Sequence, residues 1–371
     1  MSVIVTTASN DHRVSRHVLK NHSGGLEVEI LNYGARINSI KVKDKNNETL
    51  DIAMGFENFE ELDNAIKNID DPYVGAIVGR VAGSIYPSQG IEISDKKCDL
   101  YVNKANGASH HGGKVGFDKV VWEARILNQN PPSVEYSYLS KDNEEGYPGN
   151  LLVKVSYTVT DKNEIKMSYH ANIVKDETSS AHETILNVTN HAYFNLSGFR
   201  EPDIKSNYMQ IFSNKVLKTD SNLIHTGELC STKDTFEMDT NIPFNIGDKI
   251  QPLVDTPLRG FDHVFSIFET KTNDGSTNNH PEKLAAKVWC VSSGICLEVL
   301  SDEPGLVFYS GNWISPELKG KGVRYGPHCA FALESQRFNN AFSSKKWKDQ
   351  VVLKKNQAYT QNTTYKLSLI Q

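Results

Sequence analysis

The stretch LLVKVSYTVTDKNEIKMSYHANI, residues 151 to 173, sets the fold class of this chain. Apolar or aromatic side chains occupy every second position around the polar turn at 161–164: Leu151, Val153, Val155, Tyr157 and Val159 before it, and Ile165, Met167, Tyr169, Ala171 and Ile173 after it. Successive side chains of a β-strand point to opposite faces, so this period of two indicates strands with one buried face. Two such runs around a short polar turn predict an antiparallel β-hairpin.

The same alternation recurs elsewhere in the chain. Near the start, Leu26, Val28 and Ile30 alternate with glutamates, and the segment AKVWCVSSGICLEVL at 286–300 reads as two further strands around a Ser-Ser-Gly turn. We therefore expect an all-β fold, namely a large antiparallel β-sandwich with few short helices, which forms a single domain over residues 1–371.

Helical patterns are rare. In ENFEELDNAIKN, the spacing of Phe59, Leu62 and Ile66 predicts one short amphipathic helix. The segment TKTNDGSTNNHPEK at 270–283 is rich in polar and turn-forming residues, which predicts a surface loop inserted between strands.

Composition narrows the class of protein. A net charge of −5 over 371 residues argues against a nucleic-acid partner, which would require a basic excess. The five cysteines are odd in number and form no CxxC, which favours reduced thiols over disulfides or a zinc site. The apolar run at the N-terminus is too short for a signal peptide, and no stretch is long enough to span a membrane. We expect a cytoplasmic protein, a monomer or weak dimer, with a small-molecule partner and no cofactor.

Glu334 is the most distinctive single residue. The run CAFALESQRF at 329–338 is apolar up to Leu333 and then places this carboxylate at the expected end of a strand. A carboxylate that emerges from an apolar strand tends to be desolvated, which raises its pKa and suits it to act as a base near neutral pH. The alternative is a structural salt bridge to Arg337 or a nearby lysine.

The second candidate is His191, in the stretch NVTNHAYFNLSG at 187–198. Asparagines and hydroxyl side chains surround this histidine. Such side chains serve either turns or a ligand with many hydroxyls. Taken alone, a buried and hydrogen-bonded structural histidine is the more common outcome.

Three further residues stand in settings that allow either a structural or a binding role. His110 and His111 precede two glycines, which let backbone or ligand approach closely, but a glycine turn with two surface histidines is the simpler interpretation. Zinc is disfavoured, since adjacent histidines on a strand point to opposite sides and no third ligand is suitably spaced. Asp262, in LRGFDHVF, caps a turn or faces a pocket.

Several long motifs together resemble the aldose 1-epimerases, also called galactose mutarotases. They occur in the family's order and span most of the chain: VGAIVGRVAGSI, SHHGGKVGFDKVVW, EEGYPGNLLVKVSY, NVTNHAYFNLSG, RGFDHVF, EPGLVFYSGNW and FALESQRF. The resemblance implies a large β-sandwich that interconverts the α and β anomers of hexoses such as galactose and glucose, without metal or cofactor.

The resemblance also implies roles for four residues. Glu334 matches the base that removes the proton from the anomeric hydroxyl, and His191 matches the acid that protonates the ring oxygen. His111 matches a second histidine that contacts the sugar, and Asp262 matches a carboxylate that binds sugar hydroxyls. His110 occupies a position that is usually apolar in the family and receives no catalytic role.

The chain departs from the family at the sugar-binding surface. Where the family commonly reads GRxANRI, the Asn and second Arg are Gly83 and Ser84 here, and Val307 stands where a Gln or an aromatic residue is common. Arg80 matches the earlier arginine, which is not the usual ligand contact, and completes the set of candidate binding residues. A lost charged hydrogen bond is worth roughly 1.5–3 kcal/mol, so we expect the affinity for the sugar to be weaker by about 10–100-fold and KM to be high.

The chemistry is within reach of an acid and a base. If anomers exchange in water at about 10⁻⁴ s⁻¹, a rate of about 10³ s⁻¹ requires removing roughly 9–10 kcal/mol from the barrier. A positioned acid and base, each contributing about 10²–10⁴-fold, supply most of this. The assignment requires that Glu334 and His191 share one cleft.

Three alternatives compete with this hypothesis. A sugar-binding protein with weak or no turnover is favoured by the changes at 83, 84 and 307. A hexose-6-phosphate epimerase would want arginines or lysines near the phosphate, so the loss of an arginine argues against it. A glycoside hydrolase would need two opposed carboxylates, for which Glu334 and Asp262 are the only pair suggested.

Overall fold

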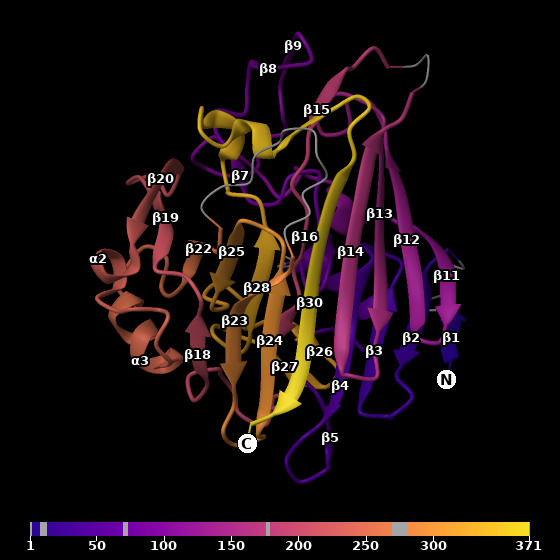
Figure 1. Cartoon of the computed structure of the whole chain (residues 1–371), viewed down its shortest axis with the longest axis vertical. Coiled ribbons are helices and arrows are strands. Elements are labelled where there is room, and N and C mark those ends of the chain that lie inside the picture. The colour runs from indigo at the N-terminus through magenta and orange to yellow at the C-terminus, as the bar shows by residue number, and fades with distance from the viewer. Residues whose placement is uncertain (1, 8–12, 70–72, 176–178, 269–280, 371) are drawn as a thin grey trace.

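The predicted hairpin lies at the centre of a nine-stranded antiparallel sheet, which faces the viewer in Figure 1. The structure is a computed structural model that describes residues 2–7, 13–69, 73–175, 179–268 and 281–370. The sheet runs in the order β11 (Glu123–Gln129), β12 (Pro132–Ser140), β13 (Leu151–Val159), β14 (Glu164–Ile173), β30 (Tyr359–Leu369), β24 (Ile295–Ser301), β23 (Lys283–Trp289), β18 (Tyr208–Ile211) and β21 (Phe244–Asn245).

A second, six-stranded antiparallel sheet packs behind the first and carries the site described below. Its order is β17 (Tyr193–Phe194), β28 (Phe331–Gln336), β25 (Gly305–Tyr309), β22 (Asp262–Ser266), β19 (Lys215–Thr219) and β20 (His225–Ser231). Alternate residues of its strands, such as Leu333 and Leu306, belong to the same buried cluster as Val155 of the large sheet. The main core therefore lies between the two sheets, and the other face of the small sheet is free to form a pocket.

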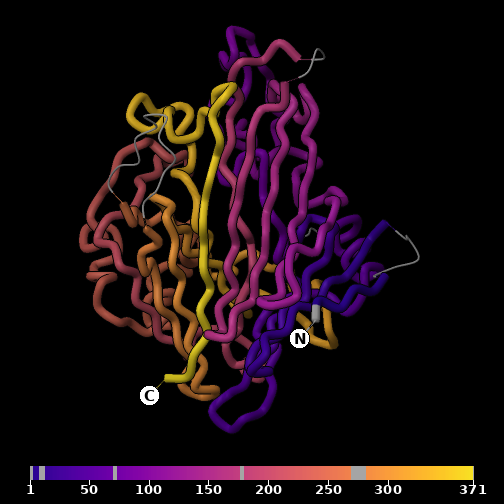
Figure 2. Tube along the Cα trace, turned by 45° about the vertical axis from the view of Figure 1, so that its right-hand side comes forward, coloured from indigo at the N-terminus to yellow at the C-terminus, as the bar shows by residue number. Residues whose placement is uncertain are grey.

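The N-terminal part of the chain forms a five-stranded antiparallel sheet, drawn in indigo at the lower right of Figure 2. Its strands pair in chain order: β1 (Ser2–Thr7), β2 (Ser15–Lys20), β3 (Leu26–Leu31), β4 (Arg36–Lys43) and β5 (Thr49–Asp51). Its apolar residues Leu26, Val28 and Ile30 are buried in the main core.

Short elements connect these sheets. The paired short strands are β6 (Ile77–Val78) with β16 (Thr189–Asn190), β7 (Ser84–Ile85) with β10 (Ser109–His110), β8 (Ile91–Ile93) with β9 (Lys96–Cys98), β15 (Glu183–Ile185) with β29 (Val352–Lys354), and β26 (Lys319–Gly320) with β27 (Val323–Arg324). The helices are α1 (Phe59–Asn68), α2 (Thr232–Phe236) and α3 (Ile246–Ile250), with 3-10 turns at Phe117–Lys119, Gln251–Leu253, Ala341–Ser343 and Lys348–Gln350.

The predicted all-β sandwich with few short helices is confirmed. The hairpin pairs in register from Leu151 opposite Ile173 to Val159 opposite Ile165. The strands predicted near residue 28 and within 286–300 are present, and the predicted helix forms with Asn58 as its N-cap. Most of the predicted loop at 270–283 lies outside the described residues, and the single domain stays a prediction.

All five cysteines are free thiols, as their spacing predicts. Within the described ranges, we find no helix with the length and apolar character needed to cross a membrane.

Candidate active site

A pocket of about 510 Å³ opens on the outer face of the six-stranded sheet. The period of two decides which side chains reach it. Glu334 and Gln336 on β28 line the pocket together with Val307 and Tyr309 on β25, while the residues between them face the core. Cross-strand pairing places Val307 directly opposite Glu334. Asp262, which pairs with Tyr309 on the next strand, extends the same wall.

The His191 segment is fixed by its backbone and by neighbouring asparagine side chains. The His191 N–H donates to the Ala76 carbonyl at 2.9 Å, and the His191 carbonyl accepts from the Gly75 N–H at 2.9 Å. The Asn190 amide donates to the Gly75 carbonyl, and the Asn187 amide donates to that of Ala82. These amides therefore bind neighbouring backbone groups, which holds the histidine in place beside β28.

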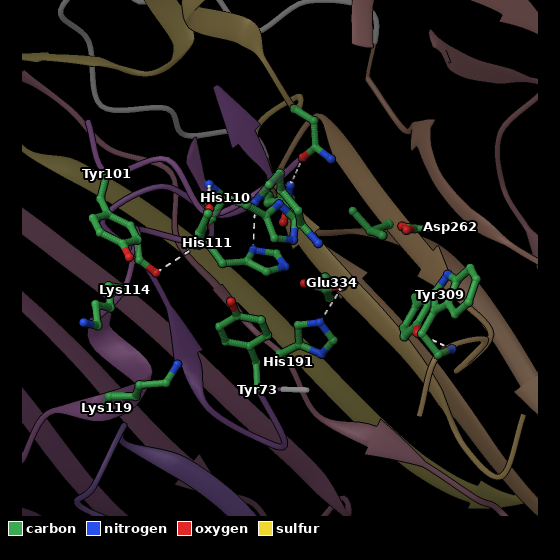
Figure 3. Close-up of a pocket in the computed structure, with 18 of the residues that line it drawn as sticks. Tyr73, Tyr101, His110, His111, Lys114, Lys119, His191, Asp262, Tyr309 and Glu334 are labelled. Atoms are coloured by element: carbon green, nitrogen blue, oxygen red, sulfur yellow. Dashed lines mark hydrogen bonds and ion pairs between the residues drawn. The ribbon is translucent and has the colours of Figure 1, made fainter. Parts of the chain in front are cut away.

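Glu334 and His191 meet in the floor of the pocket, as the assignment required. Nε2 of His191 lies 3.4 Å from Oε1 of Glu334, and the two side chains are 5% and 4% exposed. The imidazole stacks on the Tyr193 ring at 4.7 Å between centroids. Figure 3 shows Glu334 with His191 directly against it, His111 on one side and Asp262 on the other.

Burial sets the protonation of this pair. It raises the pKa of Glu334 well above its ordinary value, and the neighbouring Asp262 carboxylate adds to the effect. It lowers the pKa of His191 to about 4. Both shifts favour the neutral form of each group, which places the one proton that the pair shares on Glu334. Moving that proton to Nε2 gives a carboxylate and an imidazolium without any change in net charge.

His111 presents an N–H to the pocket. Its Nδ1 accepts a 3.1 Å hydrogen bond from the Gly83 N–H, which fixes the neutral tautomer with the proton on Nε2. Burial, followed by the neighbouring His110 and His191, holds the pKa of His111 well below its ordinary value. Its ring stands edge-on to Tyr73 at 4.6 Å. This histidine is therefore a donor near neutral pH and not a proton acceptor.

His110 also lines the pocket, so the expectation that adjacent histidines point to opposite sides is wrong. The strand β10 ends at His110, and His111 adopts a left-handed φ of +51°. The two rings consequently lie with centroids 3.6 Å apart. Nδ1 of His110 is 2.9 Å from the Ser84 hydroxyl, so Ser84 contacts a lining residue but does not itself line the pocket.

Arg80 lies away from the pocket, which contradicts its place among the candidate binding residues. Its guanidinium is buried and donates to the carbonyls of Pro148 and Gly149 and to the hydroxyls of Ser140 and Thr184. All three guanidinium nitrogens of Arg80 donate to protein acceptors, so this arginine ties neighbouring loops together.

The remaining candidates behave in different ways. Gly83, Val307 and Asp262 all line the pocket. Although solvent reaches Asp262, partial burial at the pocket wall raises its pKa to about 6.

The alternative of a Glu334–Arg337 salt bridge is wrong, because Arg337 pairs with Glu303 at 2.9 Å. Glu334 also lies within β28 and not at its end.

Several lining residues were missed by sequence reasoning. They are Tyr73, Tyr101, Asn103, Lys104, Gly113, Lys114, Lys119, Tyr193, Tyr309, Trp313, Gln336 and Asn339. The period of two from Glu334 to Gln336, and from Val307 to Tyr309, would have found two of them. Tyr193, on β17 two residues after His191, would have been found in the same way. Most of the others come from loops, which carry no periodic signal. Across the described residues, no three His, Cys, Asp or Glu side chains cluster in a way that could hold a metal ion.

Comparison with known proteins agrees with the motifs and the sheet. The sequence model of the aldose 1-epimerase family matches residues 16–366. The chain belongs to the aldose 1-epimerase family. It is 36% identical to the human galactose mutarotase over 345 residues, which cover 93% of this chain and 92% of that protein. It is 27% identical to the aldose 1-epimerase of Escherichia coli K12 over 361 residues, covering 96% of each.

Solved structures of aldose epimerases share the fold. An aldose epimerase homologue from C. elegans superposes with a TM-score of 0.81 at 24% identity, covering 95% of this chain and 98% of that chain. The galactose 1-epimerase of Lactobacillus acidophilus superposes with a TM-score of 0.77 at 20% identity, covering 100% of each. The β-sandwich of this aldose 1-epimerase family member is therefore the fold that these structures have.

Proposed function

We propose that this pocket interconverts the α and β anomers of a hexose such as galactose or glucose, with Glu334 as the base and His191 as the acid. As a member of the aldose 1-epimerase family, the protein is an isomerase that acts on the anomeric centre of an aldose. One observation carries the assignment of roles: a buried carboxylate and a buried imidazole lie 3.4 Å apart in the floor of the pocket.

The separation of the two groups suits ring opening. In a pyranose, the anomeric hydroxyl oxygen O1 and the ring oxygen O5 are both bonded to C1, so two groups in contact can reach them together. The Glu334 carboxylate takes the O1 proton, the His191 imidazolium gives a proton to O5, the C1–O5 bond breaks and a C1=O1 carbonyl forms. Rotation about C1–C2 and the reverse transfers close the ring as the other anomer.

The proton count of the pair fits this sequence. The neutral pair holds one proton, and the charged form that starts the reaction holds the same one. Sugar hydroxyls that donate to the Glu334 carboxylate favour this charged form, because hydrogen bonds to an ionised carboxylate lower its pKa. Each half-reaction moves one proton onto the pair and one off, so the pair is restored when the ring closes.

Two further residues complete the proposed site. The Nε2–H of His111 is placed to donate to a sugar oxygen and to stabilise the charge that develops there. The Asp262 carboxylate, across Glu334 from the histidines in Figure 3, accepts from sugar hydroxyls. Neither residue needs to titrate during the reaction, so both are assigned to binding and to charge stabilisation.

Polarimetry on pure α-anomers tests the proposal. His191→Asn and Glu334→Gln should each lower the rate by about 10²–10⁴-fold, which is the contribution of a positioned acid or base. Val307→Ala, which trims the same sheet face without an ionisable group, is the matched control for loss of packing. Wild-type rates in both His191→Asn and Glu334→Gln would refute the acid and base roles. If the wild-type protein binds sugar without turnover, it is a sugar-binding protein and not an enzyme.

A phosphorylated aldose is a second candidate substrate, because three lysines line one part of the pocket. Lys104 and Lys114 are exposed there, and Lys119 is bound to Asp118 at 2.5 Å. An ammonium group binds phosphate as a point charge, so these side chains supply what the missing arginine does not. A higher kcat/KM on glucose 6-phosphate than on glucose, lost in Lys104→Ala/Lys114→Ala, would favour this substrate.

The free cysteines and modest charge also support a cytoplasmic protein that is a monomer or weak dimer. Light scattering over a range of protein concentrations tests the oligomeric state. A mass that stays at two or more chains at the lowest concentration would contradict it.

A further inference from the structure

The pocket wall at residue 83 has no side chain of its own. Gly83 lines the pocket with a left-handed φ of +76°, and its N–H is the donor that fixes the His111 tautomer. A Cβ placed on Gly83 would lie 2.1 Å from Oδ1 of Asn339 and 2.5 Å from its Cγ. The Asn339 carboxamide therefore fills the space into which a side chain at residue 83 would extend.

A buried neighbour holds this carboxamide in position. Nε2 of Gln336 donates to Oδ1 of Asn339 at 2.5 Å, and Gln336 itself is only 1% exposed. Oε1 of Gln336 is buried and has no hydrogen-bond partner within the described parts of the chain. Asn339 is half-buried, and over the same residues its Nδ2 donates to no protein acceptor. The pocket wall thus presents the free donors of Asn339, while the unpaired Oε1 of Gln336 lies buried beneath them.

The Asn339 amide has the chemistry of a sugar subsite, and Gln336 holds it in place. Each hydroxyl of a sugar can accept a hydrogen bond, so the two free N–H donors of Asn339 can bind one hydroxyl or two neighbouring ones. Gln336 follows Glu334 by two residues on the same face of β28, a rise of about 7 Å along the strand. With C1 held at Glu334, hydroxyls far from the anomeric carbon come nearest to the amides.

We propose that Asn339, held over Gly83 by Gln336, is a substrate-binding residue that contributes to selection among aldoses by the configuration of hydroxyls remote from C1. This inference rests on the proposed function of the pocket. It also accounts for the change at residue 83, since a side chain three residues after the end of β28 supplies the amide that is missing from that position.

Removal of the amide is the first test. Asn339→Ala should raise KM about 3–10-fold, as for the loss of one neutral hydrogen bond, with kcat within about twofold of wild type. The increase should differ between glucose and galactose, which differ only at C4. Asn339→Asp keeps the shape and the acceptor but removes the donors, so its KM should rise as well. An unchanged KM for both sugars in Asn339→Ala would overturn the inference.

Exchange of the amide between the two positions is the sharper test. Gly83→Asn alone should lower kcat/KM by at least about 10-fold, because its side chain overlaps Asn339; asparagine is among the residues that best tolerate a positive φ. The double variant Gly83→Asn/Asn339→Ala should recover much of that loss, since the new amide then has room. Additive effects of the two changes would contradict a shared space.

A neighbour provides the matched control. Asn340 lies outside the pocket and ties loops together, since its Oδ1 accepts from the Tyr86 N–H and its Nδ2 donates to the His225 carbonyl. Asn340→Ala should lower Tm and leave KM unchanged, whereas Asn339→Ala should raise KM and leave Tm unchanged. A fall in Tm without a change in KM for Asn339→Ala would make it structural.

A binding readout separates this inference from the catalytic proposal. In a Glu334→Gln background, calorimetry should still show about 3–10-fold weaker sugar binding when Asn339→Ala is added. If Glu334→Gln turns over normally while Asn339→Ala weakens binding, only the catalytic roles fail. If Glu334→Gln is inactive and Asn339→Ala binds normally, only the amide subsite fails.

Discussion

Two buried glutamates in this protein have different partners, one an arginine and the other a histidine. Glu303 is fully buried and pairs with the guanidinium of Arg337 at 2.9 Å. Glu334 is also buried, but it faces the imidazole of His191 at 3.4 Å and opens onto the pocket. Arg337 follows Glu334 by only three residues, so the same segment contributes to both pairs.

The difference between the pairs lies in whether a proton can move. A guanidinium does not lose its proton in proteins, so the charge opposite Glu303 is permanent. An imidazole can gain and lose a proton, so the Glu334–His191 pair has two forms of equal net charge. The first pair can only hold structure together, whereas the second can pass a proton to a ligand.

The largest contrast is expected when each glutamate becomes glutamine. Glu334→Gln should lower the polarimetric rate by about 10²–10⁴-fold without lowering Tm at about pH 8. The pKa of Glu334 is raised in the folded state, so ionisation of this group costs stability as pH rises above its unfolded value, and glutamine removes that cost. A clearly lower Tm in this variant would mean that the carboxylate is structural.

Glu303→Gln should show the converse behaviour. It leaves the buried Arg337 charge without its carboxylate, a change that costs about 3–5 kcal/mol of unfolding free energy in buried pairs. Denaturant unfolding measures this loss, and the rate per folded molecule should stay close to wild type. A stable but inactive Glu303→Gln protein would place this glutamate in the catalytic machinery and remove the contrast.

The pH profile of kcat/KM should show the two limits of the one-proton pair. Below pH about 4, His191 gains a second proton while Glu334 is still protonated, so no base remains and the rate falls. On the alkaline side, the rate falls once pH exceeds the raised pKa of Glu334, because the pair then holds no proton. An acid limb near the ordinary histidine pKa of about 6.5 that persists in Asp262→Asn would show that burial does not control His191.

The smallest effect is expected at Asp262, which solvent reaches. Its pKa of about 6 means that the carboxylate is lost as pH falls through that value, so KM should rise modestly there. Asp262→Asn should have a higher KM, by about 3–10-fold, and should lack this step because it has no group to titrate. Persistence of the step in Asp262→Asn would assign it to another residue.

The sheets could be predicted from the sequence more fully than the pocket. Alternation reports which face of a strand is buried, so the hairpin at 151–173 was predicted correctly. The same rule explains why Glu334 faces away from the core. The helical spacing of Phe59, Leu62 and Ile66 likewise predicted the helix that is observed at Phe59–Asn68. Strand order across the sheets depends on contacts between distant segments, and no local pattern encodes it.

Within the site, the motifs singled out Glu334 and His191, which lie together in the pocket, but not most of the residues around them. Arg80 was placed among the binding residues because it lies in a motif, yet its donors are all used by buried backbone and hydroxyl groups. Asn339 carries no periodic or motif signal of its own. Its place beside Gly83 follows from two loops meeting in space, which only the structure shows.

Because β17 and β28 must pair before the site is complete, the recovery of enzyme activity reports a late step of refolding. These strands come from the middle and the far end of the chain, yet Tyr193 sits opposite Ala332, and this contact brings the histidine segment to the glutamate strand. Contacts between such distant segments close slowly, because a long loop must be ordered first. Turnover should therefore return only after most of the secondary structure has formed, and a polarimeter would time that last docking step.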